Sequence, residues 1–405
     1  MKILVTGGDG FCGWPTSLHL SAAGHDVLIV DNLSRRAISE RLGYESLTPI
    51  RTIQERVRMW LELTGRTIAF RNVDLAGDPA SVRQVVVDFD PHCIVHLAAQ
   101  RSAPYSMKSV ECGNYTLGNN MLSTNNVLSA IAKHDRPVKM VSLGSIGIYG
   151  YEDRHYEIPE GRAEFSGVDG NGVGYEIESA IPFHPTSLYH LSKSQITSLL
   201  SFYARSYGID ITDLYQGIVW GTQTTETAAA DELSNRFDYD EIYGTVLNRF
   251  VVQARSDMPM TVYGEGEQTR AFIHIQDTVR CIEVAVNCGA SNETDVNVMH
   301  QISETRTIRS VAERVARLTG AKIEHVTNPR GEVERHRYTL ANAKFRQLGV
   351  NRLKTLENGL IDEIDGVIGR HLGRIERGCI APRVKWNGTD RKRSRTTIED
   401  ELEVI

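Results

Sequence analysis

The chain has 405 residues, of which 41% are hydrophobic and 24% charged, and a formal net charge of −6. This length suits one large domain or two smaller ones, and the negative charge argues against a nucleic-acid partner. No apolar run reaches the roughly 18–20 residues that cross a bilayer, and the first residues lack the long apolar region of a signal peptide. We therefore expect a soluble cytoplasmic protein without a membrane partner.

Six cysteines are scattered along the chain without a Cys-x-x-Cys pair. In a chain of this length that pattern predicts reduced thiols instead of a disulfide framework. His92 and His96 have a spacing that metal sites use, but they fall on an expected strand, where four residues span roughly 13 Å. We expect no bound metal.

Short β-branched runs alternate with helical patterns through the first half of the chain. The expected strands are Lys2–Thr6, Asp26–Val30, Thr67–Arg71, Cys93–Leu97, Lys139–Leu143 and Ile211–Tyr215. The expected helices are Trp14–Ala23, Ile53–Leu63, Pro79–Phe89 and Asn120–Lys133. Because strand–helix alternation favours a parallel sheet covered on both faces, the sequence predicts a doubly wound α/β Rossmann domain over residues 1–215.

The second half of the chain contains longer polar loops between helical patterns. These patterns are Thr245–Ala254, Ile275–Asn287, Ile308–Thr319 and Leu356–Arg377. We expect residues 216–383 to form a smaller mixed α/β substrate-binding domain with segments that return to the first domain. An insert at about 151–182 contains the hairpin turn signal Asp169-Gly170-Asn171-Gly172, and residues 384–405 are expected to form a poorly ordered charged tail.

A glycine-rich turn follows the first expected strand and opens the first helix. Gly7, Gly10 and Gly13 have a G-x-x-G-x-x-G spacing, with Phe11 and Cys12 inside it. Glycines permit a tight turn and a close backbone approach to a pyrophosphate, and the free N–H groups at the helix start attract the anion. In a βαβ unit this turn predicts a dinucleotide-binding site that includes all five residues.

Asp31 ends the second expected strand, where a carboxylate accepts hydrogen bonds from both adenosine ribose hydroxyls and repels a 2′-phosphate. This favours NAD over NADP, although Arg35 and Arg36 lie close enough in sequence to support a 2′-phosphate. Asp74 follows the third strand and suits the adenine amino group, or it caps the next helix. The remaining expected cofactor contacts on these two loops are Asn32, Arg35 and Leu75.

Tyr189 and Lys193 form a Tyr-x-x-x-Lys pair, whose side chains share one face of a helix. A nearby ammonium lowers the pKa of a phenol from about 10 toward neutrality. Tyr189 can then take a proton from a sugar hydroxyl as hydride leaves for NAD. Ser145 follows the fifth expected strand and would hydrogen-bond the same hydroxyl, so these three residues are the expected catalytic groups.

This assembly resembles the extended short-chain dehydrogenase/reductase superfamily along nearly the whole chain. His96-Leu97-Ala98-Ala99 after the fourth strand and Asn120 on the next helix match its pattern. The resemblance implies that Ala98 and Ala99 line the cofactor groove and that Asn120 stabilises the sheet beside it. A homodimer is common in the superfamily and is expected here. We also expect Gln216, just after the sixth strand, to contact both cofactor and substrate.

Several segments further look like those of the UDP-sulfoquinovose synthase family. They are Gly8–Trp14, Glu45–Ile50, Gln100–Ser106, Tyr189–Lys193, Phe237–Asp240, Gly244–Phe250, Thr261–Gly264, Gln268–Arg270 and Asn328–Arg330. The resemblance implies an enzyme that joins UDP-glucose and sulfite. In that reaction the C4 hydroxyl is oxidised, water is lost across C5–C6, sulfite adds at C6, and hydride returns to C4 so that NAD is regenerated.

The resemblance also implies roles for individual substrate-binding residues. Gln100, Arg101 and Ser102 are candidates, and Arg101 with Ser102 would hold sulfite, because a guanidinium fork suits oxyanions. Arg101 has two alternatives, a pyrophosphate clamp and a surface ion pair. His190 is assigned to proton donation at C6 or to sulfonate binding, with a packed structural histidine as the alternative. The expected nucleotide-binding residues are Thr245, Asn248, Arg249, Thr261, Tyr263, Gln268 and Arg270.

Ser145, Ile146 and Ile148 depart from that family, whose pattern has Thr, Met and Glu at these positions. Losing an ionisable group near the reacting carbon leaves open an NDP-hexose 4-epimerase or 5,6-dehydratase that does not use sulfite. A non-catalytic NAD-binding scaffold is a more remote alternative, and the intact Ser145, Tyr189 and Lys193 argue against it.

Overall fold

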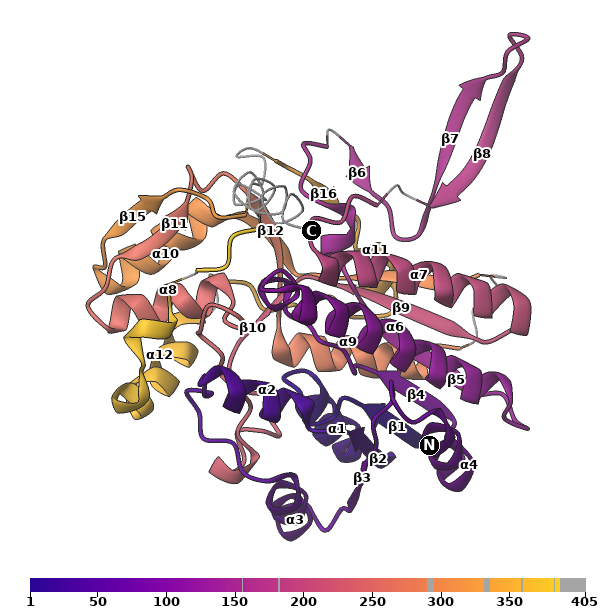
Figure 1. Cartoon of the computed structure of the whole chain (residues 1–405), viewed down its shortest axis with the longest axis horizontal. Helices are drawn as coiled ribbons and strands as arrows, with labels where there is room; N and C mark the ends of the chain where they lie inside the picture. Colours follow the sequence, from indigo (N-terminus) through magenta and orange to yellow (C-terminus); the bar gives the residue numbers. More distant parts are fainter. Residues whose placement is uncertain are drawn as a thin grey trace, which may run out of the picture.

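A seven-stranded parallel sheet forms the centre of the protein, with strand order β13-β9-β5-β4-β1-β2-β3 (Figure 1). The computed structural model describes residues 1–154, 156–180, 183–289, 295–330, 336–357, 360–381 and 383–386. The sheet strands are β1 (Lys2–Thr6), β2 (Asp26–Asp31), β3 (Ile68–Asn72), β4 (Cys93–His96), β5 (Lys139–Ser145), β9 (Ile211–Gln216) and β13 (Asn297–Gln301). This order is that of a doubly wound Rossmann sheet with one added strand, so the predicted fold class is confirmed.

Helices cover both faces of the sheet and bury two separate apolar cores. Along β1, Leu4 packs into the core beneath one helical layer, whereas Ile3 and Val5 pack into the core on the opposite face, as strand alternation requires. The first layer contains α4 (Pro79–Phe89), α6 (Val110–Ala132) and α7 (Leu188–Tyr207), and the second contains α1 (Gly13–Ala22), α3 (Ile53–Thr64) and α9 (Ile275–Asn287). Helices α2 (Ser34–Leu42) and α5 (Ala103–Ser106) lie in loops at the carboxyl ends of β2 and β4. None of the helices in the described ranges has the length and apolarity to span a membrane.

The expected strands agree with the structure to within two residues, but two elements differ from expectation. Strand β13 was not predicted, because its polar sequence Asn-Val-Met-His-Gln lacks a strand pattern, and only pairing with β9 makes it the sheet's edge. Helix α6 begins at Val110, ten residues before the expected Asn120, although Gly113, Gly118 and several Asn residues lower its helix propensity. Burial of Thr116 and Asn120 against the sheet outweighs that propensity.

The second half forms a smaller mixed α/β unit beside the sheet (Figure 1). Its strands are β10 (Ile218–Trp220), β12 (Thr269–His274) and β14 (Glu304–Thr307) in one sheet and β11 (Met260–Tyr263) and β15 (Ile323–Val326) in another. Helices α8 (Val246–Arg255), α10 (Ile308–Thr319) and α12 (Leu360–His371) pack against them. The expected helix Leu356–Arg377 was too long, because single-turn 3-10 helices at Leu372–Arg374 and Arg377–Cys379 follow α12.

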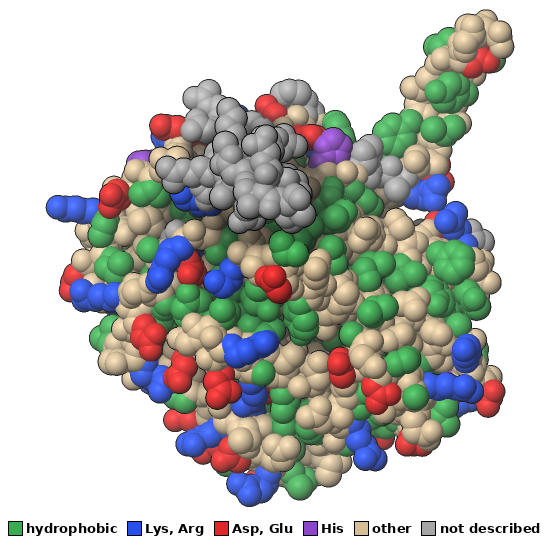
Figure 2. Space-filling view, viewed as in Figure 1, with side chains coloured by type: hydrophobic (Ala, Val, Ile, Leu, Met, Phe, Trp, Pro, Cys, Tyr) green, Lys and Arg blue, Asp and Glu red, His purple; other side chains and the backbone are tan. Residues whose placement is uncertain are grey.

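The remaining elements of the fold are short. They are the 3-10 turns Ile146–Tyr149 and Asp231–Leu233, the pair β6 (Glu157–Ile158) and β16 (Thr339–Leu340), and α11 (Ala343–Gln347). Strands β7 (Arg162–Val168) and β8 (Gly174–Ala180) form a hairpin within the predicted insert, and Figures 1 and 2 show it projecting from the body. Its turn is held by Asp169, whose carboxylate accepts from the N–H groups of Asn171 and Val173.

Three residues of the predicted tail lie on the body of the protein. Val384 packs against the buried cluster of Ile38, Tyr105, Ile242 and Tyr243, and the Trp386 backbone N–H donates to the Pro329 carbonyl at 3.0 Å. The predicted tail therefore starts too early in the sequence, because residues 384–386 contact parts of the chain that lie far away in sequence. Its remaining part, 387–405, lies outside the described residues.

His19 on α1 joins two distant segments because its imidazole pairs with a carboxylate from each of them. Its Nδ1 lies 2.8 Å from Glu226 Oε1 and its Nε2 lies 3.0 Å from Glu283 Oε2. Burial opposes the charged imidazole, but the two carboxylates outweigh it and raise the pKa of His19. The charged pairings therefore stabilise the fold fully below the unfolded-state pKa of about 6.5 and are lost as pH rises through the folded-state pKa.

His19→Gln is expected to lower the free energy of unfolding by about 2 kcal/mol at pH 6, and by much less at pH 9, where the wild-type imidazole is neutral. Urea unfolding followed by circular dichroism at both pH values measures this difference. The control is His325→Gln, at an exposed position without a carboxylate partner among the described residues. An equal loss at both pH values would contradict the ionic role.

Candidate active site

The glycine-rich turn leaves no room for side chains. Gly7 has a φ of 71°, and a Cβ on it would lie 2.7 Å from the Ala98 backbone nitrogen. A Cβ on Gly13 would lie only 2.0 Å from the Gly7 carbonyl oxygen. Helix α1 begins at Gly13, and no side chain caps its first N–H groups. The turn and the helix start therefore fit the pyrophosphate of a dinucleotide.

A pocket at the carboxyl ends of β1, β2 and β4 contains nearly all of the expected cofactor residues. They are Gly7, Gly10, Cys12, Gly13, Asp31, Asn32, Arg35, Asp74, Leu75, Ala98, Ala99, Tyr189, Lys193 and Gln216. Phe11 lines the neighbouring pocket instead. Asn120 is fully buried behind the pocket, where it accepts from Gln100 N at 2.7 Å and donates to Ser192 Oγ at 3.0 Å, so it positions the wall without lining it.

Asp31 is the carboxylate at the ribose end of this pocket. It accepts hydrogen bonds from the Asp9 and Leu33 N–H groups at 2.9 and 2.7 Å. The two arginines that could have supported a 2′-phosphate are held by other carboxylates. Arg35 donates to Asp238 at 2.9 Å and Arg36 donates to Asp9 at 2.7 Å. These pairings favour NAD over NADP.

Asp74 does not cap the following helix, because Asp78 accepts from Ser81 N at the start of α4. The capping alternative for Asp74 is therefore wrong. Its Oδ1 accepts from the Ala76 N–H at 3.2 Å and from the Asn32 side chain at 3.3 Å, beside the cofactor pocket. Asp74 therefore lines the cofactor pocket, and its contact with the adenine amino group stays a prediction.

Ser145, Tyr189 and Lys193 meet where the cofactor pocket adjoins a second, larger pocket. Burial raises the pKa of Tyr189 to about 12, against the opposing effects of the Arg101 charge and of a hydrogen bond with Ser145. The expected lowering of this pKa by Lys193 is therefore not produced by the chain's own charges. Lys193 is itself buried and donates to the Leu143 carbonyl at 2.7 Å.

Asp213 on β9 is a buried carboxyl group near Lys193 that the sequence interpretation missed. Burial lowers the pKa of Lys193 to about 8, and the Asp213 charge opposes that effect. Burial likewise raises the pKa of Asp213 to about 7, against the charge of Lys193. Thr197, one turn beyond Lys193 on α7, donates to Asp213 at 3.5 Å. An aspartate in the middle of an expected buried strand was the available signal.

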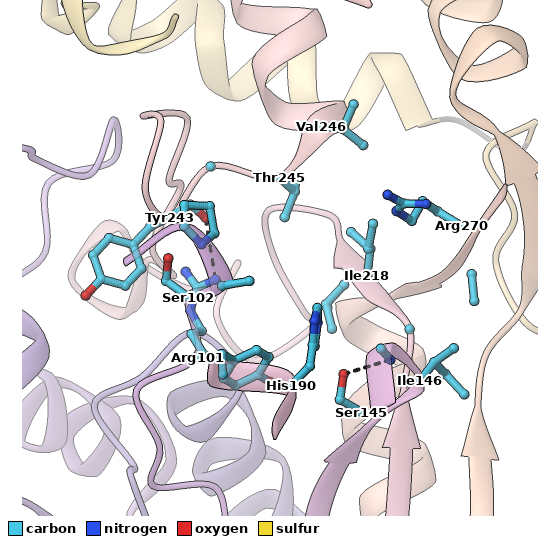
Figure 3. Close-up of a pocket in the computed structure, with 18 of the residues that line it drawn as sticks. Arg101, Ser102, Ser145, Ile146, His190, Ile218, Tyr243, Thr245, Val246 and Arg270 are labelled. Carbon is cyan, nitrogen blue, oxygen red and sulfur yellow. Dashed lines mark hydrogen bonds between the residues drawn. The ribbon is translucent and has the colours of Figure 1, made fainter. Parts of the chain in front are cut away.

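The second pocket lies between the sheet and the smaller unit and contains most of the expected substrate residues (Figure 3). They are Arg101, Ser102, Ser145, Tyr189, His190, Gln216, Thr245, Asn248, Arg249, Thr261, Tyr263, Gln268 and Arg270. Gln100 was expected here but lines the cofactor pocket and bonds the Tyr243 hydroxyl at 2.9 Å. The lining also includes Tyr151, Arg330 and Trp386, which were not predicted as site residues. The Asn-Pro-Arg string ending at Arg330 was a signal for one of them.

Arg101 and Ser102 are already bonded to protein groups. Arg101 donates to the buried carboxylate of Asp238 at 2.5 Å and to the Tyr243 carbonyl at 3.5 Å. Figure 3 shows Arg101 and Tyr243 on one side of the pocket and Arg270 on the other. The Ser102 hydroxyl donates to the Ile242 carbonyl and accepts from the Tyr105 N–H, so it caps α5. Because both side chains are already bonded to protein groups, they do not form the predicted joint site for one anion.

His190 lies over the 3-10 turn that follows β5. Its Nδ1 is 3.1 Å from the Ser187 hydroxyl, and a Cβ on Gly147 would lie 2.3 Å from its Nε2. The ring therefore requires glycine at position 147. Because His190 also lines the substrate pocket beside Ser145 (Figure 3), it is both packed and exposed to a ligand.

The opposite end of the pocket contains buried acceptors without partners. Asn248 Oδ1 and Gln268 Oε1 are buried and have no hydrogen-bond partner among the described residues. Arg249 donates to the Tyr263 hydroxyl at 3.0 Å, and Arg270 lies 2.9 Å from His336 Nε2. Since buried polar atoms rarely stay unpaired, this end suits a ligand with amide-type donors beside anionic groups, such as a nucleotide.

Known proteins resemble the chain along most of its length. The profile of the NAD dependent epimerase/dehydratase family matches residues 3–298. The chloroplastic UDP-sulfoquinovose synthase of Spinacia oleracea is 40% identical over 95% of this chain and 79% of its own length. The UDP-sulfoquinovose synthase of Sulfolobus acidocaldarius is 34% identical over 95% of this chain and 98% of its own length.

Solved structures share the fold. UDP-glucose 4-epimerase from Thermotoga maritima, crystallised with UDP-glucose, gives a TM-score of 0.67 at 21% identity and covers 92% of this chain and 100% of its own. UDP-glucuronic acid 4-epimerase from Bacillus cereus, in complex with UDP-glucuronic acid and NAD, gives 0.65 at 21% identity over 91% of this chain and 100% of its own. Together with the glycine turn and Asp31, these findings identify NAD as the cofactor.

Asp31→Asn is expected to weaken NAD binding about tenfold and to narrow the preference for NAD over NADP, because the amide neither accepts ribose hydrogen bonds as strongly nor repels a 2′-phosphate. Isothermal titration of both dinucleotides measures the two affinities. Asp26→Asn, at the exposed start of the same strand, is the matched control. An unchanged NAD-to-NADP ratio would contradict this role of Asp31.

Proposed function

Because the chain belongs to the NAD dependent epimerase/dehydratase family, we propose that it converts UDP-glucose and sulfite into UDP-sulfoquinovose with NAD regenerated. The protein is an NAD-dependent enzyme that modifies sugar nucleotides, and this excludes the alternative of a non-catalytic NAD-binding scaffold. The two synthases that resemble it along 95% of the chain support the finer assignment.

One observation carries the proposal: the substrate pocket joins a nucleotide-type end to a catalytic end at the cofactor. At one end, Asn248 and Gln268 offer side-chain oxygens that no described residue pairs with. Tyr189 and Gln216 line both pockets, so a sugar held there would present its C4 hydroxyl where cofactor and substrate meet. In the proposed pose the uracil N–H donates to one of the unpaired amide oxygens, and Arg249 and Arg270 bind the diphosphate.

Tyr189 is the proposed base for the C4 hydroxyl, and Ser145 holds that hydroxyl by a hydrogen bond. When bound, NAD would supply the hydride acceptor and donor at C4 and, in its oxidised form, a positive charge in the pocket that Tyr189 lines. Such a charge would favour the phenolate, which burial disfavours by raising the pKa of Tyr189 to about 12. Lys193 is buried and lines the cofactor pocket, where its bond to the Leu143 carbonyl holds it in place.

The later steps use the acidity that a 4-ketone gives to the C5 hydrogen. Loss of that proton and of the C6 hydroxyl as water leaves a C5–C6 double bond conjugated with the ketone. Sulfite then forms a C–S bond at C6, C5 regains a proton, and the ketone is reduced back to the alcohol. His190 is the proposed proton donor on this side of the sugar, because its ring lines the pocket beside Ser145.

Arg101 is the proposed sulfite-binding residue, but without the second ligand, Ser102, that the sequence predicted. Its guanidinium is held by Asp238, and that carboxylate is shared with Arg35. The two arginines and one carboxylate carry a net positive charge. This charge at the pocket wall attracts an oxyanion without a second ligand from Ser102.

A second candidate function is an NDP-hexose 4-epimerase or 5,6-dehydratase that does not use sulfite. It is favoured by the ion pair of Arg101 with Asp238, which leaves that guanidinium partly committed to the protein. Ile148, where the synthase pattern has Glu, also provides no ionisable group for the C6 chemistry.

A homodimer is part of the proposal. Leu122 on α6 and Phe202 and Tyr207 on α7 are each at least half exposed, and these two helices pack side by side on one face of the sheet. Two copies meeting through this pair of helices would cover these apolar side chains.

Incubation of the protein with NAD, UDP-glucose and sulfite is expected to yield a UDP-sugar carrying a sulfonate, detected by mass spectrometry. Omitting sulfite should abolish that product. Tyr189→Phe should lower its rate at least 100-fold, because the C4 proton then has no base. Tyr175→Phe, on the exposed hairpin, is the matched control and should leave the rate unchanged. UDP-galactose or a dehydrated sugar without any sulfonate would support the second candidate function instead.

Arg101→Ala is expected to raise the KM for sulfite about tenfold or more while the KM for UDP-glucose changes little, because the variant removes one positive charge near C6. Asp238 keeps Arg35 as a partner, so the fold should persist. Steady-state rates with each substrate varied separate the two constants. Arg136→Ala, at a surface ion pair with Asp90, is the control. A selective rise in the KM for UDP-glucose would instead assign Arg101 to the diphosphate.

A further inference from the structure

The C-terminal segment 383–386, hereafter the C-terminal strap, is tied to the protein at three points. The Arg383 N–H donates to the Glu241 carboxylate at 2.5 Å. Val384 packs against the apolar cluster of Ile38, Tyr105, Ile242 and Tyr243, of which Tyr243 lines both the cofactor and the substrate pockets. The Trp386 N–H then donates to the Pro329 carbonyl at 3.0 Å. The strap therefore links the loop between the two pockets to the segment that precedes Arg330.

Trp386 brings an aromatic ring to the wall of the substrate pocket. The Arg330 guanidinium lies 4.8 Å from the centre of the Trp386 ring and 5.6 Å from the centre of the Tyr263 ring. All three residues line the same pocket. An arginine that contacts two aromatic rings loses side-chain freedom, so these rings help to fix where the Arg330 guanidinium lies in the pocket wall.

We propose that the C-terminal strap closes the nucleotide end of the substrate pocket, with Trp386 forming one wall of the site for the nucleoside diphosphate and positioning Arg330 toward it. The inference rests on the proposed function, because it takes the ligand to be a uridine diphosphate sugar. The indole covers the ligand with an apolar face, and the cation–π contact directs the guanidinium into the pocket. The strap thereby makes nucleotide affinity depend on residues near the end of the chain.

The fluorescence response of Trp386 to a nucleotide can be distinguished from that of the other tryptophans. The chain has four, and Trp14, Trp60 and Trp220 are at most 3% exposed in the apolar cores. Trp386 is partly exposed and lines the pocket. A nucleotide that binds against the indole should therefore change the fluorescence of Trp386 and leave the other three unchanged.

Titration of the full-length protein with UDP tests the inference by two readouts. UDP should quench the tryptophan fluorescence of the unmodified protein, and Trp386→Phe should remove the quench while calorimetry still detects UDP binding within threefold of the original Kd. Trp386→Ala should weaken UDP about tenfold and raise the KM for UDP-glucose with kcat nearly unchanged. Lys385→Ala, an exposed neighbour on the strap, is the matched control and should behave as the unmodified protein.

The outcomes separate this inference from the proposed function. UDP binding to Trp386→Ala with unchanged Kd, or a quench that persists in Trp386→Phe, would overturn the role of Trp386 while leaving a uridine nucleotide site intact. A fall in kcat without a change in KM would also overturn it, because a wall of the nucleotide site acts on binding. Failure of the unmodified protein to bind UDP would contradict the proposed function itself.

Discussion

The buried carboxylate of Asp9 holds the glycine-rich turn to three other parts of the chain. It accepts hydrogen bonds from Arg36, Arg56 and Arg236, at 2.7, 3.0 and 3.1 Å. Burial alone would raise the pKa of Asp9, but the three guanidinium groups outweigh it and lower that pKa. Removing Asp9 would take this counter-charge from the buried Arg56 and Arg236, which costs far more than the loss of an exposed ion pair. The shape of the cofactor site therefore depends on this cluster.

A second buried carboxylate also pairs with arginines, at the boundary between the cofactor and substrate pockets. Asp238 pairs with Arg35 from the cofactor side and Arg101 from the substrate side. Arg35 also stacks on the ring of Tyr243, 3.4 Å from its centre, and Tyr243 lines both pockets. A ligand that binds in either pocket therefore meets a wall that also lines the other pocket. A shared wall of this kind suits an enzyme whose sugar must meet the cofactor at one carbon.

Local sequence patterns predicted the parts of this site that depend on neighbouring residues. The glycine turn, Asp31 and the Tyr189–Lys193 pair all lie where strand and helix periodicity located them. Patterns could not predict contacts between residues far apart in sequence. The pairing of Arg101 with Asp238 joins residues 137 positions apart, and it changes the role expected for Arg101. The pKa of Tyr189 was misjudged for a similar reason, since burial by the folded chain outweighs the effect of a helical neighbour.

The three departures from the synthase pattern affect the pocket unequally. Ser145 keeps the hydroxyl that Thr provides in the family, and Ile146 replaces one apolar pocket residue by another. Ile148, where the family has Glu, is fully buried in the apolar core and does not line the pocket. Under the proposed reaction, the proton transfers at C5 and C6 then depend on groups that do line it. His190 and Tyr151 are such groups: their ring centres lie 6.1 Å apart, and both residues line the same pocket as Ser145.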